Sequence, residues 1–247
     1  MNTNQGYLSI KNLSFSYKPT IKPVIKEFSC EITLGSRVAI LGLNGSGKST
    51  LLNLLLGMLA PDSGNIDLLN TSAPRSLSTL DGAIGYLPQM ENIPFDYLVY
   101  EYVLLGRLTH IPLFSVPNEV DKKKVSDVLY SLKMADFYGK RLREISGGEL
   151  QRVRLARILA QEPEIILMDE PATHLDIKNK RSLYKLINEL CTQGKTIIYS
   201  SHDPLDIADA SDYCILMSQS KETRLAVTSE LLNSDLLTEY FETDLKL

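Results

Sequence analysis

Hydrophobic positions along this chain follow two spacings, and short runs of each kind alternate. Runs rich in β-branched and other apolar residues predict strands. The predicted strands are Tyr7–Lys11, Phe28–Leu34, Arg37–Leu41, Asn65–Leu69, Ala83–Leu87, Ile165–Met168, Lys195–Ser200 and Asp212–Met217. Stretches with the helical spacing of apolar residues are Lys48–Gly57, Val120–Met134, Glu149–Gln161, Arg181–Cys191 and Thr228–Leu247. This alternation of strands and helices is typical of an α/β protein with a parallel sheet.

One segment interrupts the alternation. From about Ile93 to Glu144 the pattern is mostly helical. We interpret residues 93–144 as a helical subdomain inserted between the two parts of a sheet domain, residues 1–92 and 145–247. A chain of 247 residues can bury a sizeable core as one large domain. We therefore expect a single domain with an inserted subdomain.

Composition narrows the class of protein. Hydrophobic residues make up 44% of the chain and charged residues 23%, which is ordinary for a globular protein, and the net charge is −4. A surface that binds nucleic acid usually carries a basic excess, so we expect no nucleic-acid partner. The N-terminus lacks the basic and apolar blocks of a signal peptide, and no apolar run is long enough to cross a bilayer.

A glycine-rich motif follows the predicted strand Arg37–Leu41. Its sequence, GLNGSGKST, fits the pattern G-x-x-x-x-G-K-[ST], and a predicted helix begins within it. Backbone N–H groups of such a loop, together with the positive end of the helix, bind phosphate. Lys48 would reach the β- and γ-phosphates, and Ser49 would hold Mg²⁺. The alternative is a glycine-rich turn without a ligand. The candidate nucleotide-binding residues are Gly42, Leu43, Asn44, Gly45, Ser46, Gly47, Lys48, Ser49 and Thr50.

Two acids follow the short, fully apolar strand predicted at Ile165–Met168. In proteins with a phosphate-binding loop of this kind, an aspartate such as Asp169 completes the Mg²⁺ shell. Glu170 could polarise the attacking water as a general base. A helix cap or a solvated turn before Pro171 is the alternative interpretation. The glycine-rich, phosphate-binding loop earlier in the chain favours the catalytic interpretation of the two acids.

A second pair of glycines lies in ISGGE, far along the chain from the first loop. Ser146 and Glu149 fit a capping box, which explains both polar residues as a helix start. It does not explain Gly147 and Gly148, because glycine costs roughly 1 kcal/mol relative to alanine inside a helix. We therefore expect a ligand close to this backbone, and an anion suits a helix N-terminus.

Together these motifs resemble the ATP-binding-cassette (ABC) ATPases. ISGGE resembles the signature motif of that family, and the motifs occur in the family's order. Tyr17 resembles the aromatic residue that stacks on adenine, although a tyrosine at a strand end is often only packed. Gln89 resembles the Q-loop glutamine that contacts Mg²⁺, and Asp176, in ATHLD, resembles the D-loop aspartate. His202 resembles the switch histidine near the γ-phosphate, with a helix cap as the alternative.

The resemblance implies both a fold and an assembly. The fold would be a P-loop ATPase core with an N-terminal antiparallel β-subdomain and an inserted α-helical subdomain. ATP and Mg²⁺ would be the cofactors, with Ser49, Gln89 and Asp169 at the metal and Glu170 and His202 catalytic. In the family two copies pack head to tail. The residues acting across that homodimer would be Ser146, Gly147, Gly148, Glu149 and Asp176.

The apolar, aromatic segment Ile93–Phe114 is a candidate binding surface for a partner protein. Part of it must be core, and the rest could receive a short helix from a membrane subunit. YEYVLLGR and ATHLDI resemble ATPase subunits of importers for iron chelates, haem or cobalamin, with zinc and manganese importers as the near alternative. A soluble, non-transport ABC ATPase and a binding module that does not hydrolyse ATP are further alternatives. The importer interpretation implies permease subunits, an indirect solute-binding protein, and a peripheral place on the cytoplasmic face of the membrane.

Overall fold

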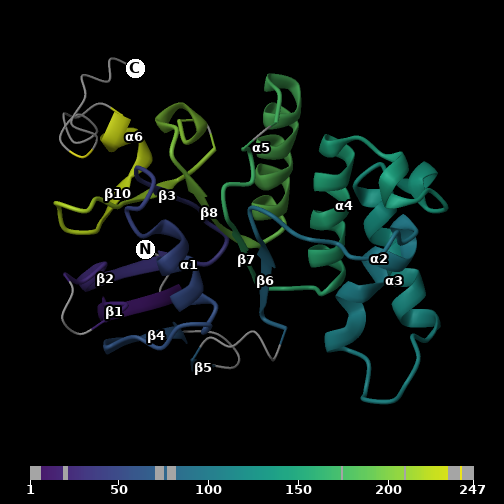
Figure 1. The fold of residues 1–247 in the computed structure, drawn as a ribbon, viewed down its shortest axis with the longest axis horizontal. Coiled ribbons are helices and arrows are strands. Elements are labelled where there is room, and N and C mark those ends of the chain that lie inside the picture. Colours follow the sequence, from purple (N-terminus) through teal and green to yellow (C-terminus); the bar gives the residue numbers. More distant parts are fainter. Residues whose placement is uncertain are drawn as a thin grey trace.

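The computed structural model describes residues 7–18, 22–69, 75–76, 82–173, 175–208, 210–232 and 240. Within these residues the strands form a four-stranded sheet of order β2-β1-β4-β5 and a six-stranded sheet of order β10-β9-β3-β8-β7-β6 (Figure 1). The strands are β1 (Tyr7–Phe15), β2 (Ile25–Thr33), β3 (Arg37–Leu41), β4 (Ser63–Leu69), β5 (Arg75–Ser76), β6 (Ile84–Leu87), β7 (Ile165–Met168), β8 (Thr196–Ser201), β9 (Tyr213–Leu216) and β10 (Arg224–Val227). The sequence pattern missed β5 and β10.

The helices account for most of the remaining chain. The α-helices are α1 (Lys48–Leu55), α2 (Val99–Leu104), α3 (Glu119–Ser131), α4 (Gly147–Ala160), α5 (Ile177–Thr192) and α6 (Thr228–Leu232). Short 3₁₀ helices are η2 (Leu105–Thr109), η3 (Ala135–Phe137), η4 (Leu142–Glu144) and η5 (Pro204–Asp206). Most of the helix predicted after Thr228 lies outside the described residues.

Parallel pairing in the larger sheet gathers the loops that carry the motifs. β3, β6, β7, β8 and β9 pair in parallel, and β10 is antiparallel to β9. The carboxyl ends of parallel strands meet at one edge of a sheet, where ligands of such sheets bind. The loops after β3, β6, β7 and β8 therefore come together although they are far apart in sequence.

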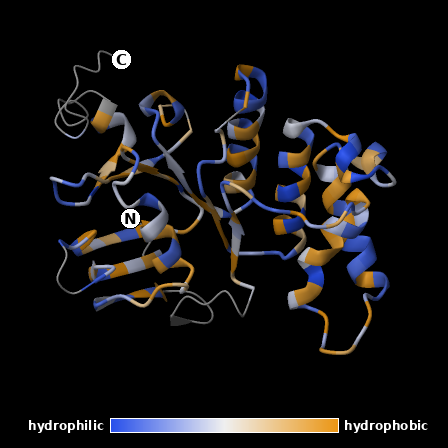
Figure 2. Ribbon diagram, in the orientation of Figure 1, coloured by the Kyte–Doolittle hydropathy of each residue, from blue (hydrophilic) through white to orange (hydrophobic). Residues whose placement is uncertain are grey.

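Alternate residues of the central strands enter two different cores. Val38 and Ile40 of β3 join the core that α1 and the smaller sheet complete. Ala39 and Leu41 join the core on the other face, which α5 covers with Ile187 and its apolar neighbours. Both faces of the sheet are thus buried, which is why these strands are continuously apolar. Figure 2 shows apolar and polar residues alternating along α5, as expected for a helix with one buried face.

A third core lies among α2, α3 and α4. It includes Tyr102, Val103, Leu129 and Val153, all buried. Burying a side chain such as Leu129 contributes about 1.5–3 kcal/mol. Other residues of α4, such as Leu155, pack into the core of the sheet instead. Helix α4 thereby joins the helical part to the sheet, and the exact limits of a subdomain at 93 and 144 stay a prediction.

Candidate active site

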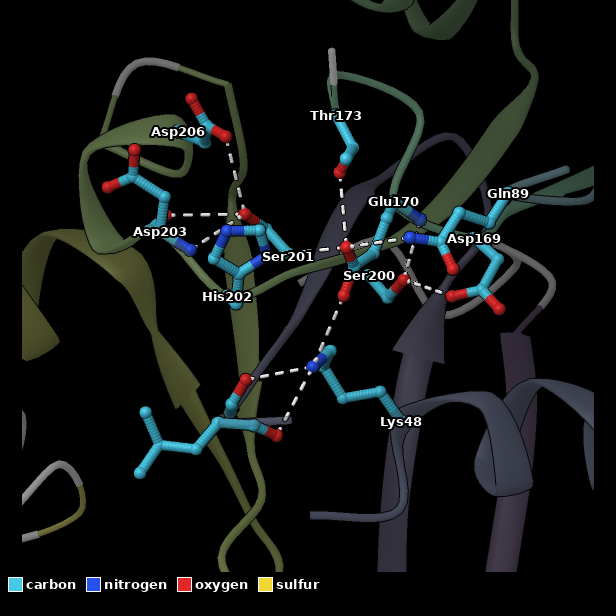
Figure 3. A network of polar contacts seen from close by, with 12 residues as sticks. Lys48, Gln89, Asp169, Glu170, Thr173, Ser200, Ser201, His202, Asp203 and Asp206 are labelled. Atoms are coloured by element: carbon cyan, nitrogen blue, oxygen red, sulfur yellow. Dashed lines mark hydrogen bonds and ion pairs between the residues drawn. The ribbon is translucent and has the colours of Figure 1, made fainter. Parts of the chain in front are cut away.

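The carboxylate of Glu170 is the meeting point of the loops at the edge of the sheet (Figure 3). Its Oε1 lies 3.5 Å from Lys48 Nζ, and its Oε2 accepts a hydrogen bond from Gln89 Nε2 at 3.2 Å. His202 Nδ1 lies 3.3 Å from the same Oε2, and Thr173 Oγ1 donates to it at 3.1 Å. Loops after β3, β6, β7 and β8 thus each supply a group to one carboxylate.

Asp169, the preceding residue, is held by two serines. Ser49 Oγ donates to Oδ2 of Asp169 at 2.9 Å, and Ser200 Oγ donates to Oδ1 at 2.6 Å. The Ser200 hydroxyl oxygen also accepts the backbone N–H of Glu170 at 2.8 Å. Ser200 therefore fixes both acids. Sequence reasoning missed it, although its place at the end of a strand just before His202 was a usable signal.

A backbone turn explains how two successive acids reach one site. Glu170 has a φ of 44°, in the left-handed region that non-glycine residues adopt at a cost of roughly 1–2 kcal/mol. The carbonyl oxygen of Glu170 accepts the N–H of Thr173 at 3.2 Å, which closes the turn. Side chains of consecutive strand residues would point to opposite faces. The turn brings Glu170 onto the side of Asp169.

The glycine-rich loop holds a buried cation and a buried hydroxyl. Lys48 is 5% exposed, and its Nζ donates to the carbonyl oxygens of Gly42 at 2.9 Å and Leu43 at 3.3 Å. Ser46 is 4% exposed, and its Oγ has no hydrogen-bond partner among the described residues. Gly47 has a φ of 103°, which favours glycine. A loop with a cation, a free hydroxyl and a helix N-terminus fits a bound phosphate chain.

The residues also fit a magnesium ion. The hydroxyl of Ser49 and the carboxylate of Asp169 are neighbouring oxygen ligands, of the kind that Mg²⁺ prefers. The amide of Gln89 is directed to Glu170 (Figure 3), and its predicted role at the metal stays a prediction.

Tyr17 lies beside this loop with an exposed ring. It is 63% exposed, packs edge-to-face on Phe15 with ring centroids 5.1 Å apart, and shares a 3.0 Å hydrogen bond with Thr50 Oγ1. The ring is therefore both packed and accessible. Its stacking on adenine stays a prediction.

The second glycine pair begins α4, with Ser146 as its N-cap. Glu149 Oε2 accepts the N–H and the Oγ–H of Ser146, each at 2.7 Å, and these bonds lower the pKa of Glu149. A Cβ on Gly148 would press against the amide of Asn179, whereas a Cβ on Gly147 would meet no atom of a described residue within 4 Å. Packing against Asn179 therefore explains Gly148, and the predicted ligand beside Gly147 stays a prediction.

Asp176 caps α5, where its Oδ1 accepts the N–H of Asn179 at 2.7 Å. The predicted action of Asp176 across a dimer stays a prediction. In the apolar segment Ile93–Phe114, Tyr102 is 1% exposed and Phe95 is 66% exposed. Tyr102 is therefore a core residue, whereas Phe95 belongs to an exposed apolar surface.

The sequence profile of the ABC transporter family matches residues 25–173. This chain belongs to that family. It is 33% identical over 246 residues to the iron chelatin transport ATP-binding protein of Helicobacter pylori, covering 97% of this chain and 94% of that protein. It is 32% identical over 232 residues to the molybdate import ATP-binding protein MolC of Haemophilus influenzae, covering 92% and 87%. It is 34% identical over 214 residues to the manganese transport system ATP-binding protein MntB of Listeria innocua, covering 86% and 87%.

A solved structure gives the same answer for the fold. It is described as a metal-chelate type ABC transporter in an inward-facing conformation, and it superposes with a TM-score of 0.84 at 30% identity, covering 96% of this chain and 89% of that one. The ABC ATPase has the predicted P-loop core, antiparallel β-subdomain and inserted helices, and the predicted ATP-binding and ATPase activity is confirmed. Among the described helices of the ABC ATPase, none has the length and apolar content needed to cross a bilayer.

Proposed function

We propose that this ABC ATPase drives an importer for an iron chelate, haem or cobalamin. The similarity to the iron chelatin transport protein and to the metal-chelate type transporter supports this substrate class. The similarity to a manganese transport protein favours the alternative, a zinc or manganese importer. The molybdate import relative has comparable identity, so a test must include an oxyanion. Uptake of a radiolabelled iron chelate, haem, cobalamin, zinc, manganese and molybdate by cells with and without the gene distinguishes these substrates, and unchanged uptake of the iron chelate, haem and cobalamin would overturn the proposal.

The convergence of four loops on Glu170 carries the catalytic part of the proposal. Glu170 acts as the general base that takes a proton from the attacking water. His202, 3.3 Å from the carboxylate and half-exposed, would stabilise the developing charge of the γ-phosphate. Gln89 orients the carboxylate through its 3.2 Å hydrogen bond.

The phosphate chain would replace contacts that the loop now makes with itself. Lys48 would turn from the carbonyl oxygens of Gly42 and Leu43 to the phosphates, and the free hydroxyl of Ser46 would gain an acceptor. When bound, Mg²⁺ would be held by Ser49 and Asp169 and would neutralise phosphate charge.

A homodimer would bring the second glycine pair to the nucleotide. In Figure 1 helices α1 and α4 lie on opposite sides of β6 and β7, so one chain has its two phosphate-binding helix starts far apart. Ser146 and Gly147 are exposed, and the space beside Gly147 is open. In a head-to-tail dimer this helix start of one copy would cover the ATP on the P-loop of the other. ATP would then favour the closed dimer by mass action.

Replacement of Glu170 by glutamine tests the site and the dimer together. Glu170→Gln is expected to lower the rate of phosphate release by roughly 10²–10⁴-fold while ATP still binds, because the amide cannot accept the proton. Size-exclusion chromatography with ATP and Mg²⁺ is expected to show a stable dimer. Unchanged hydrolysis would overturn the role of Glu170, and a monomer at saturating ATP would overturn the shared site.

Exposed apolar residues around the helical part would contact the permease on the cytoplasmic face of the membrane, with a solute-binding protein acting indirectly through the permease. Phe95 and Leu108 are suitable probes because they are 66% and 60% exposed, whereas Tyr102 and Val103 are core. Phe95→Ser is expected to reduce co-purification with membranes and to leave ATP affinity unchanged. The matched change Tyr102→Ser is expected to unfold the chain instead.

A further inference from the structure

A second polar network lies behind the candidate active site, and Arg154 of α4 is its centre. Arg154 is 8% exposed. Its Nη2 donates to the carbonyl oxygen of Pro88 at 2.6 Å, its Nε to Glu91 Oε2 at 3.1 Å, and its Nη1 to Gln151 Oε1 at 2.9 Å. One guanidinium therefore ties α4 to the loop after β6 at two points.

Gln151, one helical turn before Arg154, continues the network to the next loop. Its Nε2 donates to the carbonyl oxygen of Pro171 at 3.0 Å. Pro88 directly precedes Gln89, and Pro171 directly follows Glu170. The backbones on either side of the 3.2 Å hydrogen bond between Gln89 and Glu170 are therefore both held by adjacent side chains of one helix.

We propose that Arg154 is a positioning residue for ATP hydrolysis, which fixes Gln89 against Glu170 through Pro88 and, with Gln151, through Pro171. This inference rests on the proposed roles of Gln89 and Glu170. The inference adds that the positions of Gln89 and Glu170 depend on side chains of α4. That helix begins at Ser146 and Gly147, so a contact made there would reach Glu170 through Gln151 and Arg154.

The chemistry of the network suits a positioning role better than a stabilising one. A buried charge needs a partner, and a buried ion pair often contributes no more than apolar packing would. Glu91 is already neutralised by Arg157 Nη1 at 3.1 Å and accepts Tyr102 OH at 2.8 Å. What Arg154 adds is a planar fork of donors that reaches a carboxylate, an amide and a backbone carbonyl at once. The single ammonium of a lysine cannot reproduce that arrangement.

Arg107 provides a matched control. It is 5% exposed, and its guanidinium contacts Asp121 at 3.1 Å, Glu162 at 2.8 Å and the carbonyl oxygen of Ala160 at 2.7 Å. It is therefore as buried and as extensively bonded as Arg154. None of these contacts involves the loops that carry Gln89 or Glu170.

The test compares Arg154→Met with Arg107→Met in the full-length chain. Arg154→Met is expected to lower kcat for phosphate release by about 10–100-fold, because small displacements of catalytic groups have effects of this size. The KM for ATP is expected to stay within about threefold, since the phosphate-binding loop keeps its contacts. Arg107→Met is expected to keep kcat within about threefold of the unchanged chain. It is nevertheless expected to lower the melting temperature at least as much as Arg154→Met does. Equal kcat losses in the two variants would overturn the proposal.

Two further variants keep the test decisive if Arg154→Met folds poorly. Arg154→Lys restores the charge beside Glu91, so it is expected to recover the melting temperature but not kcat. Full recovery of kcat would reassign the role to charge alone. Gln151→Met leaves the Arg154–Glu91 pair intact and removes the contact to Pro171 together with the hydrogen bond that Gln151 accepts from Arg154. It is expected to lower kcat with little change in melting temperature, and an unchanged kcat would overturn the link to Glu170.

A double-mutant cycle with Gln89→Ala tests the route. If Arg154 acts by fixing Gln89, its replacement lowers kcat less once Gln89 is gone. The fold-loss of kcat in the double variant is then smaller than the product of the two single fold-losses. Independent, multiplying losses would overturn the proposed route. Failure of the proposed function is distinguishable, because it would appear as full activity of Glu170→Gln. Failure of this inference alone would appear as an inactive Glu170→Gln beside an active Arg154→Met.

Discussion

The two glycine-rich helix starts of this ABC ATPase differ in how far the chain itself explains them. In the loop before α1, a Cβ on Gly42 would overlap the carbonyl oxygen of Met217 and the hydroxyl of Ser46, and one on Gly47 would overlap Val24. Packing within the chain thus requires these glycines. At the start of α4, a Cβ on Gly147 would meet no atom within 4 Å in the part of the chain that the structure describes.

The difference indicates what each region lacks. The loop of Lys48 has its cation, the proposed metal-binding oxygens and the proposed catalytic acid within one chain. The start of α4 satisfies its own polar groups through Ser146 and Glu149 and leaves open space beside an exposed glycine. The first region is a nearly complete candidate binding site, and the second is an open surface that would become part of a site only in the proposed dimer.

Removal of the cation from the first region should have the largest effect. Lys48→Ala is expected to weaken ATP binding by on the order of 100-fold, because a charge-assisted hydrogen bond contributes roughly 1.5–3 kcal/mol. Isothermal titration calorimetry measures the affinity, with Lys185→Ala as a surface control, since the Lys185 side chain is 79% exposed. An unchanged affinity for Lys48→Ala would contradict the phosphate-binding role of the loop.

Alanine substitutions at Gly42 and Gly147 should differ in their effect on stability, because packing within the chain requires a glycine only at Gly42. Gly42→Ala is expected to destabilise the chain by about 1–3 kcal/mol, because the backbone of Met217 cannot move away easily. Gly147→Ala is expected to be neutral or to stabilise by up to about 1 kcal/mol through helix propensity. Chemical denaturation measures both, and a destabilised Gly147→Ala would remove the contrast.

The same alanine at Gly147 should impair assembly. Combined with Glu170→Gln, Gly147→Ala is expected to weaken the ATP-dependent dimer by roughly tenfold, the equivalent of about 1.4 kcal/mol. Sedimentation of the double variant against Glu170→Gln alone gives the comparison. A dimer of equal affinity would show that Gly147 does not approach the nucleotide.

The capping box should give the smallest effect, and one that depends on pH. The pKa of Glu149 in the folded chain is lowered by its bonds to Ser146. A lowered folded-state pKa means that the stabilisation is present above the unfolded value, about 4.3, and is lost as pH falls through the folded value. Glu149→Ala is therefore expected to lower the melting temperature slightly at pH 7 and by less at pH 3. An equal loss at both values would exclude the charged cap.

Much of the fold was predictable because apolar spacing reports burial directly. The strand Ile165–Met168 is found at its predicted bounds, since a parallel strand buried on both faces is continuously apolar. The strand Arg224–Val227 was missed because its residues are half-buried or exposed at the edge of the sheet. Tyr102 and Phe95 belong to one aromatic segment, and only packing against α3 and α4 separates core from surface there.

The candidate site was predictable where a motif is continuous in sequence, as around Lys48 and Glu170, which the structure brings together. Ser200 and Arg154 were missed because their contacts join separate elements. Thr173, three residues after Glu170 in the same loop, was also missed. Hydroxyl and guanidinium groups of this kind are common on any surface. The position of Ser200 just before His202 was a usable signal, but the contacts themselves form only where the sheet brings the partners within hydrogen-bond distance.

The sequence by itself determined the fold class through apolar periodicity, and it pointed to the phosphate-binding loop and the two acids through short motifs. The ABC family followed from the resemblance of those motifs to the family's own. Only the tertiary structure decided that Glu170 receives groups from four loops, that Gly148 packs on Asn179 while Gly147 is open, and that Arg154 links Pro88 to α4. The physical reason is that parallel strands bring together loop ends from distant parts of the chain. Hydrogen bonds act over about 3 Å of space, whatever the distance along the sequence.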